Sequence, residues 1–298
     1  MRKIDLHNIR LKNRVLFEFL DENFSIVIIL LVFALLGYWI WQTNDTYSEF
    51  GQNFLSEMLG VLITVLIINQ LIVIREEKRK LPHRFAVYDD IRLFISNYML
   101  FWQQAFQDSV PEDDPENIYT FFSEDGMGKV WDYLYLKAQP KSAIPCCWYE
   151  HIIEVANEFR AKGDKILTRH SKYLPPQVYR MIHQITEAHY LDVIVNMHKM
   201  KIYAESHNIP KINVLESYAV IRPNDKDYAA ILGIFEWCDN IYKELSTLDK
   251  STAQVNNYFP KKNKVMPPHS MIPKEILVQE TELWMNYLKQ KAQEGANN

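Results

Sequence analysis

The residue types most often used in catalysis occur in this sequence without the spacing that catalysis needs. Four histidines lie on or near one long predicted helix: His183, His189, His198 and His207. Neither His-Glu-x-x-His nor Glu-x-x-His occurs, so no zinc hydrolase or di-iron bundle is indicated. The stretch Asp125–Val130, DGMGKV, lacks Walker spacing and a preceding strand, which favours a helix N-terminus over a phosphate-binding loop. Gly-x-Ser-x-Gly, Cys-x-x-Cys and dinucleotide-binding patterns are also absent from the sequence.

A second group of candidate residues surrounds His151, where Glu150, Glu154 and Glu158 could form a carboxylate-rich face. A solvated helix surface is the simpler interpretation, because exposed helix faces commonly carry such residues. We therefore expect no catalytic residue, no metal site and no cofactor, and a protein that is not an enzyme. An active site assembled from residues scattered along the sequence is the alternative.

The three cysteines, Cys146, Cys147 and Cys238, do not form a disulfide framework, since their number is odd and two of them are adjacent. We expect reduced thiols that act as small apolar side chains. A redox or metal-binding role for the adjacent pair is the alternative.

The charge of the chain bears on nucleic-acid binding. The formal net charge of -4 gives no electrostatic reason to expect it, and we predict none directly. The tract Lys261–Lys264, KKNK, is a local exception beside Tyr258 and Phe259. It is interpreted as a solvated loop, with a contact to nucleic acid or lipid headgroups as the alternative.

Two uncharged apolar runs, Phe24–Trp41 and Met58–Ile74, dominate the N-terminal quarter of the chain. A helix that crosses the bilayer core needs about 20 mainly apolar residues. One such run is compatible with a core helix of a soluble protein, but two close together are harder to explain in that way. We predict two transmembrane helices, at about residues 24–42 and 54–74, within an N-terminal segment of residues 1–80.

The residues around the two runs predict their orientation. Basic residues precede the first run and follow the second, whereas residues 42–57 contain no lysine or arginine. This asymmetry places both termini in the cytoplasm of a multi-pass protein of the bacterial inner membrane. Aromatic residues crowd the outer end of the first run, and no cleavage-site pattern follows it, so we expect a retained anchor. The expected cytoplasmic anchor of the second helix is Arg75, Lys78, Arg79 and Lys80.

Small residues within the runs are candidates for helix packing. Gly60 and Thr64 are four residues apart in the second run, and Ala34 and Gly37 are three apart in the first. Such spacing lets helix backbones approach closely. Packing within one hairpin and contact between copies of an oligomer are both compatible with it.

Two polar residues, Asn69 and Gln70, lie close to the inner end of the second run. Amides are tolerated there because water and headgroups are near. They are candidates for hydrogen bonds between helices or for the inner mouth of a pore.

The remaining residues, 81–298, predict a cytoplasmic bundle of five or six helices. Pro82 is suited to a helix first turn. Helical periodicity then favours helices near residues 87–105, 129–137, 149–166, 181–202, 225–248 and 272–292, with polar loops at 108–117 and 251–268. Pro175 and Pro176 separate two of these helices, which we expect to form an antiparallel hairpin. No strand pattern is evident, so the fold class is all-α: a transmembrane helical hairpin plus a cytoplasmic helical bundle.

The second run, EMLGVLITVLIINQL followed by REE, resembles a recurrent pattern of two-span bacterial inner-membrane proteins. The segment FRAKGDKILTRHSKYLPPQVYRMIHQI resembles the cytoplasmic helical domains attached to them. Some proteins of this kind are membrane effectors of anti-phage defence systems, including the two-span effectors of bacterial retrons. The resemblance covers about half of the chain and carries no catalytic motif. It implies an antiviral effector or toxin that acts on the membrane.

Two functions follow as expectations. In the first, the cytoplasmic domain binds a cytosolic protein or ribonucleoprotein partner, and the hairpin forms a homo-oligomer that disrupts or permeabilises the lipid bilayer. In the second, the chain is a membrane-anchored scaffold or adaptor that recruits a cytosolic partner. The sequence does not indicate the activating signal, the partner, the oligomeric state or any ion selectivity.

Overall fold

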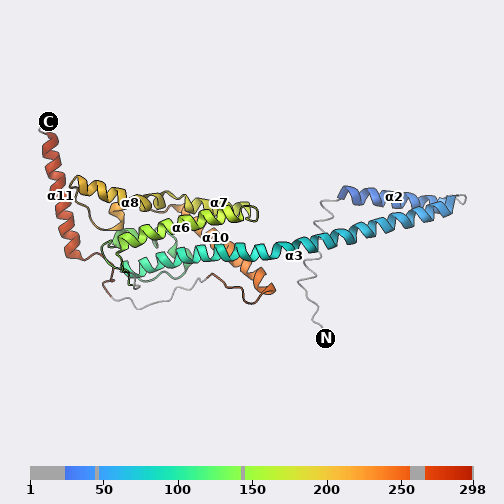
Figure 1. Ribbon diagram of the computed structural model, residues 1–298, viewed down its shortest axis with the longest axis horizontal. Helices are drawn as coiled ribbons and strands as arrows, with labels where there is room; N and C mark the ends of the chain where they lie inside the picture. Colours follow the sequence, from blue (N-terminus) through green and yellow to red (C-terminus); the bar gives the residue numbers. More distant parts are fainter. Residues whose placement is uncertain (1–23, 44–46, 142–144, 256–265, 297–298) are drawn as a thin grey trace. The chain divides into compact units, whose positions relative to one another are not determined.

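The computed structural model describes residues 24–43, 47–141, 145–255 and 266–296, and this part of the chain is mostly helical and contains no strand (Figure 1). The predicted all-α class is therefore confirmed. Contacts between residues divide the chain into two compact units, residues 1–83 and residues 84–298, close to the predicted boundary at residue 80.

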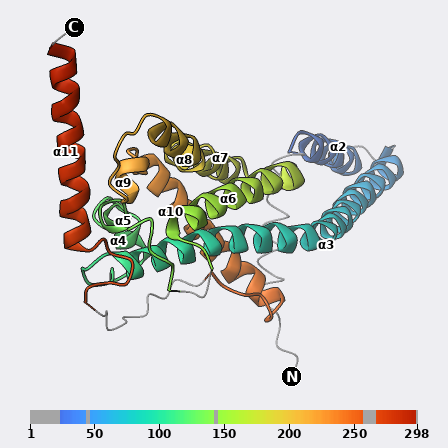
Figure 2. The ribbon, with the colours of Figure 1, turned by 60° about the vertical axis from the view of Figure 1, so that its left-hand side comes forward.

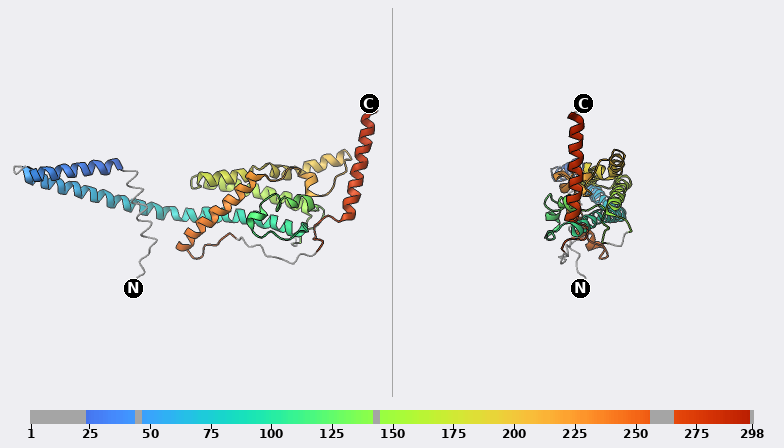
Figure 3. Two further views of the ribbon diagram at one scale, coloured as in Figure 1. Left: turned by 180° about the vertical axis from the view of Figure 1, so that it is seen from behind. Right: turned by 90° about the vertical axis from the view of Figure 1, so that its left-hand side faces the viewer.

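The first unit consists of α2 (Phe24–Thr43) and the N-terminal part of α3 (Ser48–Ser109). The two helices run antiparallel and side by side (Figures 1 and 3). Helix α3 is 62 residues long and continues without interruption into the second unit. The expectation that Pro82 begins a helix was therefore wrong, since Pro82 lies inside α3. A proline inside a helix removes one backbone hydrogen bond, and here the residues on both sides of it remain helical.

The second unit is a bundle around the C-terminal part of α3. Its long helices are α6 (Trp148–His170), α8 (His189–Ser206), α10 (Asp225–Leu248) and α11 (Lys274–Ala296). Helix α7 (Pro176–Thr186) packs on both α6 and α10, and α8 packs on α6 (Figure 2). Three short helices complete the described part: α4 (Ile118–Phe121), α5 (Lys129–Tyr133) and α9 (Leu215–Tyr218).

The core of the bundle is rich in aromatic side chains. The predicted stripes on α3 and α6 are buried: Val87, Ile91, Phe94, Tyr98, Phe101 and Ala105 on α3, and Tyr149, Ile152, Ala156, Phe159, Gly163 and Ile166 on α6. Phe94 stacks on Phe159 with ring centroids 4.2 Å apart, and Trp102 stacks on Trp131 of α5 at 5.0 Å. Such pairs contribute about 0.5–1.5 kcal/mol beyond the burial of their area.

Two predicted helices differ from the structure. The helix expected at 129–137 ends at Tyr133, because the backbone beyond it bonds to distant segments: the Tyr135 N–H donates to the Ser270 carbonyl at 2.9 Å, and the Leu136 N–H donates to the Asn213 carbonyl at 2.8 Å. The helix expected at 181–202 is broken into α7 and α8 at residues 187 and 188.

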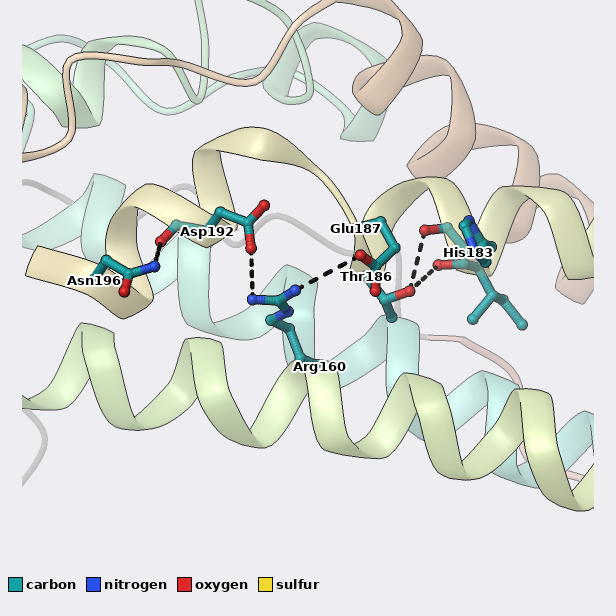
Figure 4. Close-up of polar contacts among 7 residues, drawn as sticks. Arg160, His183, Thr186, Glu187, Asp192 and Asn196 are labelled. Carbon is teal, nitrogen blue, oxygen red and sulfur yellow. Dashed lines mark hydrogen bonds and ion pairs between the residues drawn. The ribbon is translucent and has the colours of Figure 1, made fainter.

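The break between α7 and α8 is held by polar contacts with α6 (Figure 4). Arg160 of α6 reaches across to the carboxylates of Glu187, at 3.8 Å, and Asp192, at 2.7 Å. The Thr186 hydroxyl donates to the Ile182 and His183 carbonyls, both at 3.1 Å. We call this break, at residues 187 and 188, the elbow. Periodicity alone does not reveal it, since the apolar pattern continues through it.

Gly163 of α6 lies close to Thr186, the last residue of α7, at the elbow. A Cβ atom placed on this buried glycine would lie 2.0 Å from Cγ2 of Thr186 and 3.3 Å from Cε2 of Phe94. Only glycine leaves room for this contact, so the elbow depends on the absence of a side chain at position 163.

Candidate functional site

The outer surface of the helical hairpin formed by α2 and the N-terminal part of α3 is the candidate functional site. Large apolar side chains cover it and are exposed, with 66% of Leu35 and 61% of Leu71 accessible to solvent. Apolar patches of this extent are rare on monomeric soluble proteins and mark surfaces that meet another apolar phase or partner. The other exposed apolar residues include Leu31, Val32, Phe33, Leu36, Leu59, Val61, Ile63, Ile67, Ile68, Ile72 and Ile74.

By length and composition, one helix of the described residues, α3, is apolar enough to cross a membrane. Its most apolar stretch has a mean hydropathy of 2.3 and none of it is buried inside the protein. A core helix of a soluble protein also reaches such a hydropathy, but a core helix is mostly buried. Within α2, residues Ile28–Gln42 form a shorter apolar helical stretch.

The two helices of the hairpin meet through small residues. Ala34 is 7% exposed, and a Cβ atom on Gly37 would lie 2.9 Å from Cδ1 of Phe54 and 3.0 Å from the backbone nitrogen of Leu55. The structure thus places Gly37 at the contact with α3 and buries Ala34 one turn away on α2. Phe33 adds an edge-to-face contact with Phe54, with ring centroids 6.3 Å apart.

Among the three glycines of the hairpin, Gly51 makes the tightest contact, and no sequence pattern pointed to it. A Cβ atom there would lie 2.5 Å from the backbone nitrogen of Trp41 and 2.9 Å from the Gly37 carbonyl oxygen. These are backbone atoms, which cannot rotate out of the way as a side chain can. Gly51 precedes the second apolar run, so no apolar pattern surrounds it.

The predicted pair Gly60 and Thr64 lies elsewhere on α3. No described atom lies within 4 Å of a Cβ atom placed on Gly60, and the exposed Thr64 hydroxyl donates to the Gly60 carbonyl of its own helix at 2.8 Å. Gly60 follows Gly51 by nine residues, and at 100° per residue it faces about 180° away from the α2 contact. Among the described residues, this face of α3 therefore has no partner within the chain.

The two ends of the hairpin differ in chemistry. Tyr38 and Trp41 form an edge-to-face pair, with centroids 6.0 Å apart, near the connection between the helices. At the other end, the predicted anchor residues Arg75, Lys78, Arg79 and Lys80 are all exposed on α3. Lys80 approaches Glu76 at 3.6 Å, an exposed pair of the kind that contributes little to stability. The basic residues of positions 2–14 lie outside the described part of the chain.

Asn69 and Gln70 both lie in α3, one to two turns before the anchor residues. Gln70 is partly exposed. On α3 these amides lie between the pair Gly60 and Thr64 and the anchor residues that begin at Arg75.

The glycine-rich stretch before α5 is a turn in which the backbone N–H groups of both glycines already form hydrogen bonds within the chain. The Gly126 N–H donates to the Ser123 hydroxyl at 3.1 Å, and the Gly128 N–H donates to the Ser123 carbonyl at 3.3 Å. Lys129 forms an ion pair with Glu112. Helix α5 begins at Lys129, which confirms the interpretation of this stretch as a helix N-terminus.

Histidines and carboxylates do not gather into a metal site among the described residues. The histidines at 183, 189, 198 and 207 are exposed. His151 is half-buried against Phe101 and Trp148, and burial lowers the pKa of its imidazole. Its neighbours Glu150, Glu154 and Glu158 are exposed, in agreement with a solvated helix face.

The three cysteines are free thiols. Cys238 is fully buried in α10, and burial raises the pKa of its thiol to about 12. Cys146 and Cys147 are half-buried before α6, and burial also raises the pKa of Cys146. A raised pKa disfavours the thiolate, which is the reactive and metal-binding form. The Lys-rich tract at residues 261–264 lies outside the described part of the chain.

Comparison of this sequence and structure with protein-family models, curated proteins and solved structures found no match.

Proposed function

We propose that this protein is a non-enzymatic effector of the bacterial inner membrane, whose hairpin crosses the bilayer and permeabilises it on assembly. One observation carries the proposal: two antiparallel apolar helices expose an apolar surface, with aromatic residues at one end and four cationic residues at the other. Lipid is the solvent that makes such a surface favourable, and cationic side chains hold the corresponding end in the cytoplasm.

The dimensions of the helices support the same proposal. At about 1.5 Å per residue, the 20 residues of α2 extend about 30 Å, which matches the hydrocarbon core of a bilayer. Small residues at the α2–α3 contact are also typical of membrane helices, because lipid provides no hydrophobic driving force and close packing must hold the helices together.

The open face around Gly60 and Thr64 is where copies would associate. It lies opposite the α2 contact, so assembly through it leaves the hairpin intact. Asn69 and Gln70 would then lie near the cytoplasmic mouth of the assembly, where polar groups are tolerated. The resemblance to two-span effectors suggests anti-phage defence as the setting, with a cytosolic protein or ribonucleoprotein acting on the helical domain.

The experiment that tests this function is induced expression of the full chain in bacteria with a membrane-potential dye. The Gly60→Leu substitution fills the open face, whereas Val61→Leu adds bulk at an exposed position of the neighbouring face and serves as the control. We expect the unmodified chain and Val61→Leu to depolarise the membrane, and Gly60→Leu to leave it polarised while remaining in the membrane fraction.

Other outcomes would redirect the interpretation. Recovery of the chain in the aqueous fraction without detergent would refute the membrane location itself. Growth arrest with an intact membrane potential would refute permeabilisation. If deletion of residues 1–80 removed only the membrane location and left a captured partner bound, the hairpin would be an anchor and the chain a scaffold or adaptor.

A further inference from the structure

Helix α11 carries exposed apolar side chains on more than one side and is tied to the bundle through Glu280. Ile276, Trp284 and Tyr287 are half-buried, and Glu280 between them is tied to the bundle. Its carboxylate accepts hydrogen bonds from the Asn213 backbone N–H, at 2.8 Å, and side-chain amide, at 2.6 Å. These contacts fix one side of the helix, while most of α11 extends away from the other helices (Figure 2).

The second face is exposed and has the spacing of a helix-pairing seam. Val278, Met285 and Leu288 are 57%, 49% and 44% exposed. Thr281 and Ala292, also exposed, complete the spacings 3, 4, 3 and 4. At 100° per residue, this seam is centred about 120° from Glu280, the residue of α11 that bonds to the bundle. Alternation of three and four residues is the pattern of two helices that pack along their length.

The charges beside the seam distinguish between parallel and antiparallel pairing of two copies of the helix. Glu282 lies next to the seam in the first half of α11 and Lys289 lies on the same side in the second half. In a parallel pair these residues would not face each other. In an antiparallel pair that sets Met285 against Leu288 of the other helix, Glu282 lies beside Lys289 of the other helix, and two-fold symmetry repeats the contact.

We propose that α11 pairs antiparallel with α11 of a second copy of this chain, through the seam of Val278, Thr281, Met285, Leu288 and Ala292. The complementary charges fit a second copy better than a lipid surface. Helices that lie on anionic membranes carry an excess of cations, whereas α11 has four glutamates and three lysines. The pairing does not depend on the membrane function of the hairpin.

The test uses the full chain in mild detergent and exchanges the two charges. Glu282→Lys alone, or Lys289→Glu alone, places like charges together at both symmetric contacts and should raise the dissociation constant of the pair about tenfold or more. An equal mixture of the two variants restores opposite charges across the seam and should recover the affinity of the unmodified chain. Glu294→Lys makes the same reversal away from the seam and should leave the affinity unchanged.

A carbodiimide cross-link between Glu282 and Lys289 provides a second measurement. Within one helix these residues are seven apart, about 10 Å along the axis, which is too far for a zero-length link. In a mixture of ¹⁴N- and ¹⁵N-labelled chains, we expect the linked peptide to contain both labels. The measurement is repeated in the Gly60→Leu variant, so that loss of assembly by the hairpin and loss of pairing by α11 are distinguished.

The proposal is overturned by a monomeric chain in the Gly60→Leu background, by single reversals that leave the affinity unchanged, or by a mixture that fails to recover it. Binding of α11 to anionic vesicles with loss of the mixed-label peptide would instead identify a lipid surface as its partner and also overturn the proposal.

Discussion

Replacement of Gly163 by alanine should destabilise the helical bundle, although alanine is the better helix former. In the interior of a helix, alanine is favoured over glycine by about 1 kcal/mol. Against this gain, the new Cβ atom would lie 2.0 Å from Cγ2 of Thr186. Thr186 cannot turn away cheaply, because its hydroxyl donates to the carbonyls of Ile182 and His183. The hydroxyl has one proton, so the two carbonyls share a single hydrogen bond, which contributes about 1 kcal/mol.

Overpacking of a well-packed core costs about 1–3 kcal/mol, to which the strained hydroxyl contacts add. After subtraction of the helix-propensity gain, we expect a net loss of about 2 kcal/mol. For a unit of this size, each kcal/mol lowers the melting temperature by about 2–4 °C, so the melting temperature should fall by about 4–8 °C. The assay is thermal unfolding of the full chain in mild detergent, followed by tryptophan fluorescence.

Gly233→Ala is the matched control. Its new Cβ atom would lie 2.5 Å from Sδ of Met181, but an unbranched methionine can adapt its rotamers. Gly233→Ala should therefore leave the melting temperature unchanged or raise it by a few degrees, as helix propensity alone predicts.

A second substitution isolates the contact. Thr186→Ser removes the methyl group that the new Cβ would meet and keeps the hydroxyl. The loss caused by Gly163→Ala should be smaller in the Thr186→Ser background, with a coupling of about 1–2 kcal/mol. If Gly163→Ala raised the melting temperature as much as Gly233→Ala, or if the two substitutions were additive, the close approach at the elbow would not be a determinant of stability.

Two further predictions concern the hairpin and the buried thiol. Gly51→Ala should destabilise the packing of α2 on α3 by about 1–3 kcal/mol, because its Cβ atom would meet backbone atoms. It should therefore slow disulfide formation between cysteines placed at Phe33 and Phe54, whereas Gly60→Ala, with open space around it, should not. Equal rates of disulfide formation in the two variants would contradict the close contact at Gly51. The pKa of Cys238 rises from 9.0 to about 12 on folding. The thiol therefore contributes stability that is complete below pH 9 and is lost as the pH rises towards 12, at up to about 1.4 kcal/mol per pH unit. In denaturant titrations at pH 8 to 11, the free energy of unfolding should decline less steeply with pH in Cys238→Ala than in the unmodified chain. An equal decline would show that the Cys238 thiol does not have the raised pKa.

The candidate site was predictable in part. Ala34 and Gly37 are small residues within an apolar run, and the structure buries Ala34 and places Gly37 at the α2–α3 contact. Gly51 was missed because its importance comes from the close passage of the Trp41 backbone, which no local pattern encodes. The open space around Gly60 could not be predicted either. The spacing of small residues shows that a helix face allows close packing, but not whether another helix covers that face.

The sequence by itself determined the all-α class and the buried stripes of α3 and α6, because a helix repeats every 3.6 residues and its apolar face is therefore visible in a local window. It also determined the two apolar runs and the position of the basic residues beside them. Only the tertiary structure decided where α7 and α8 separate, why α5 stops at Tyr133 and which side of α11 contacts the bundle. Those features depend on Arg160, on the backbone of residues 213 and 270, and on the hydrogen bonds of Glu280. Each is a contact between residues far apart in the chain, whose energy overrides the weak local preference for a longer or differently oriented helix.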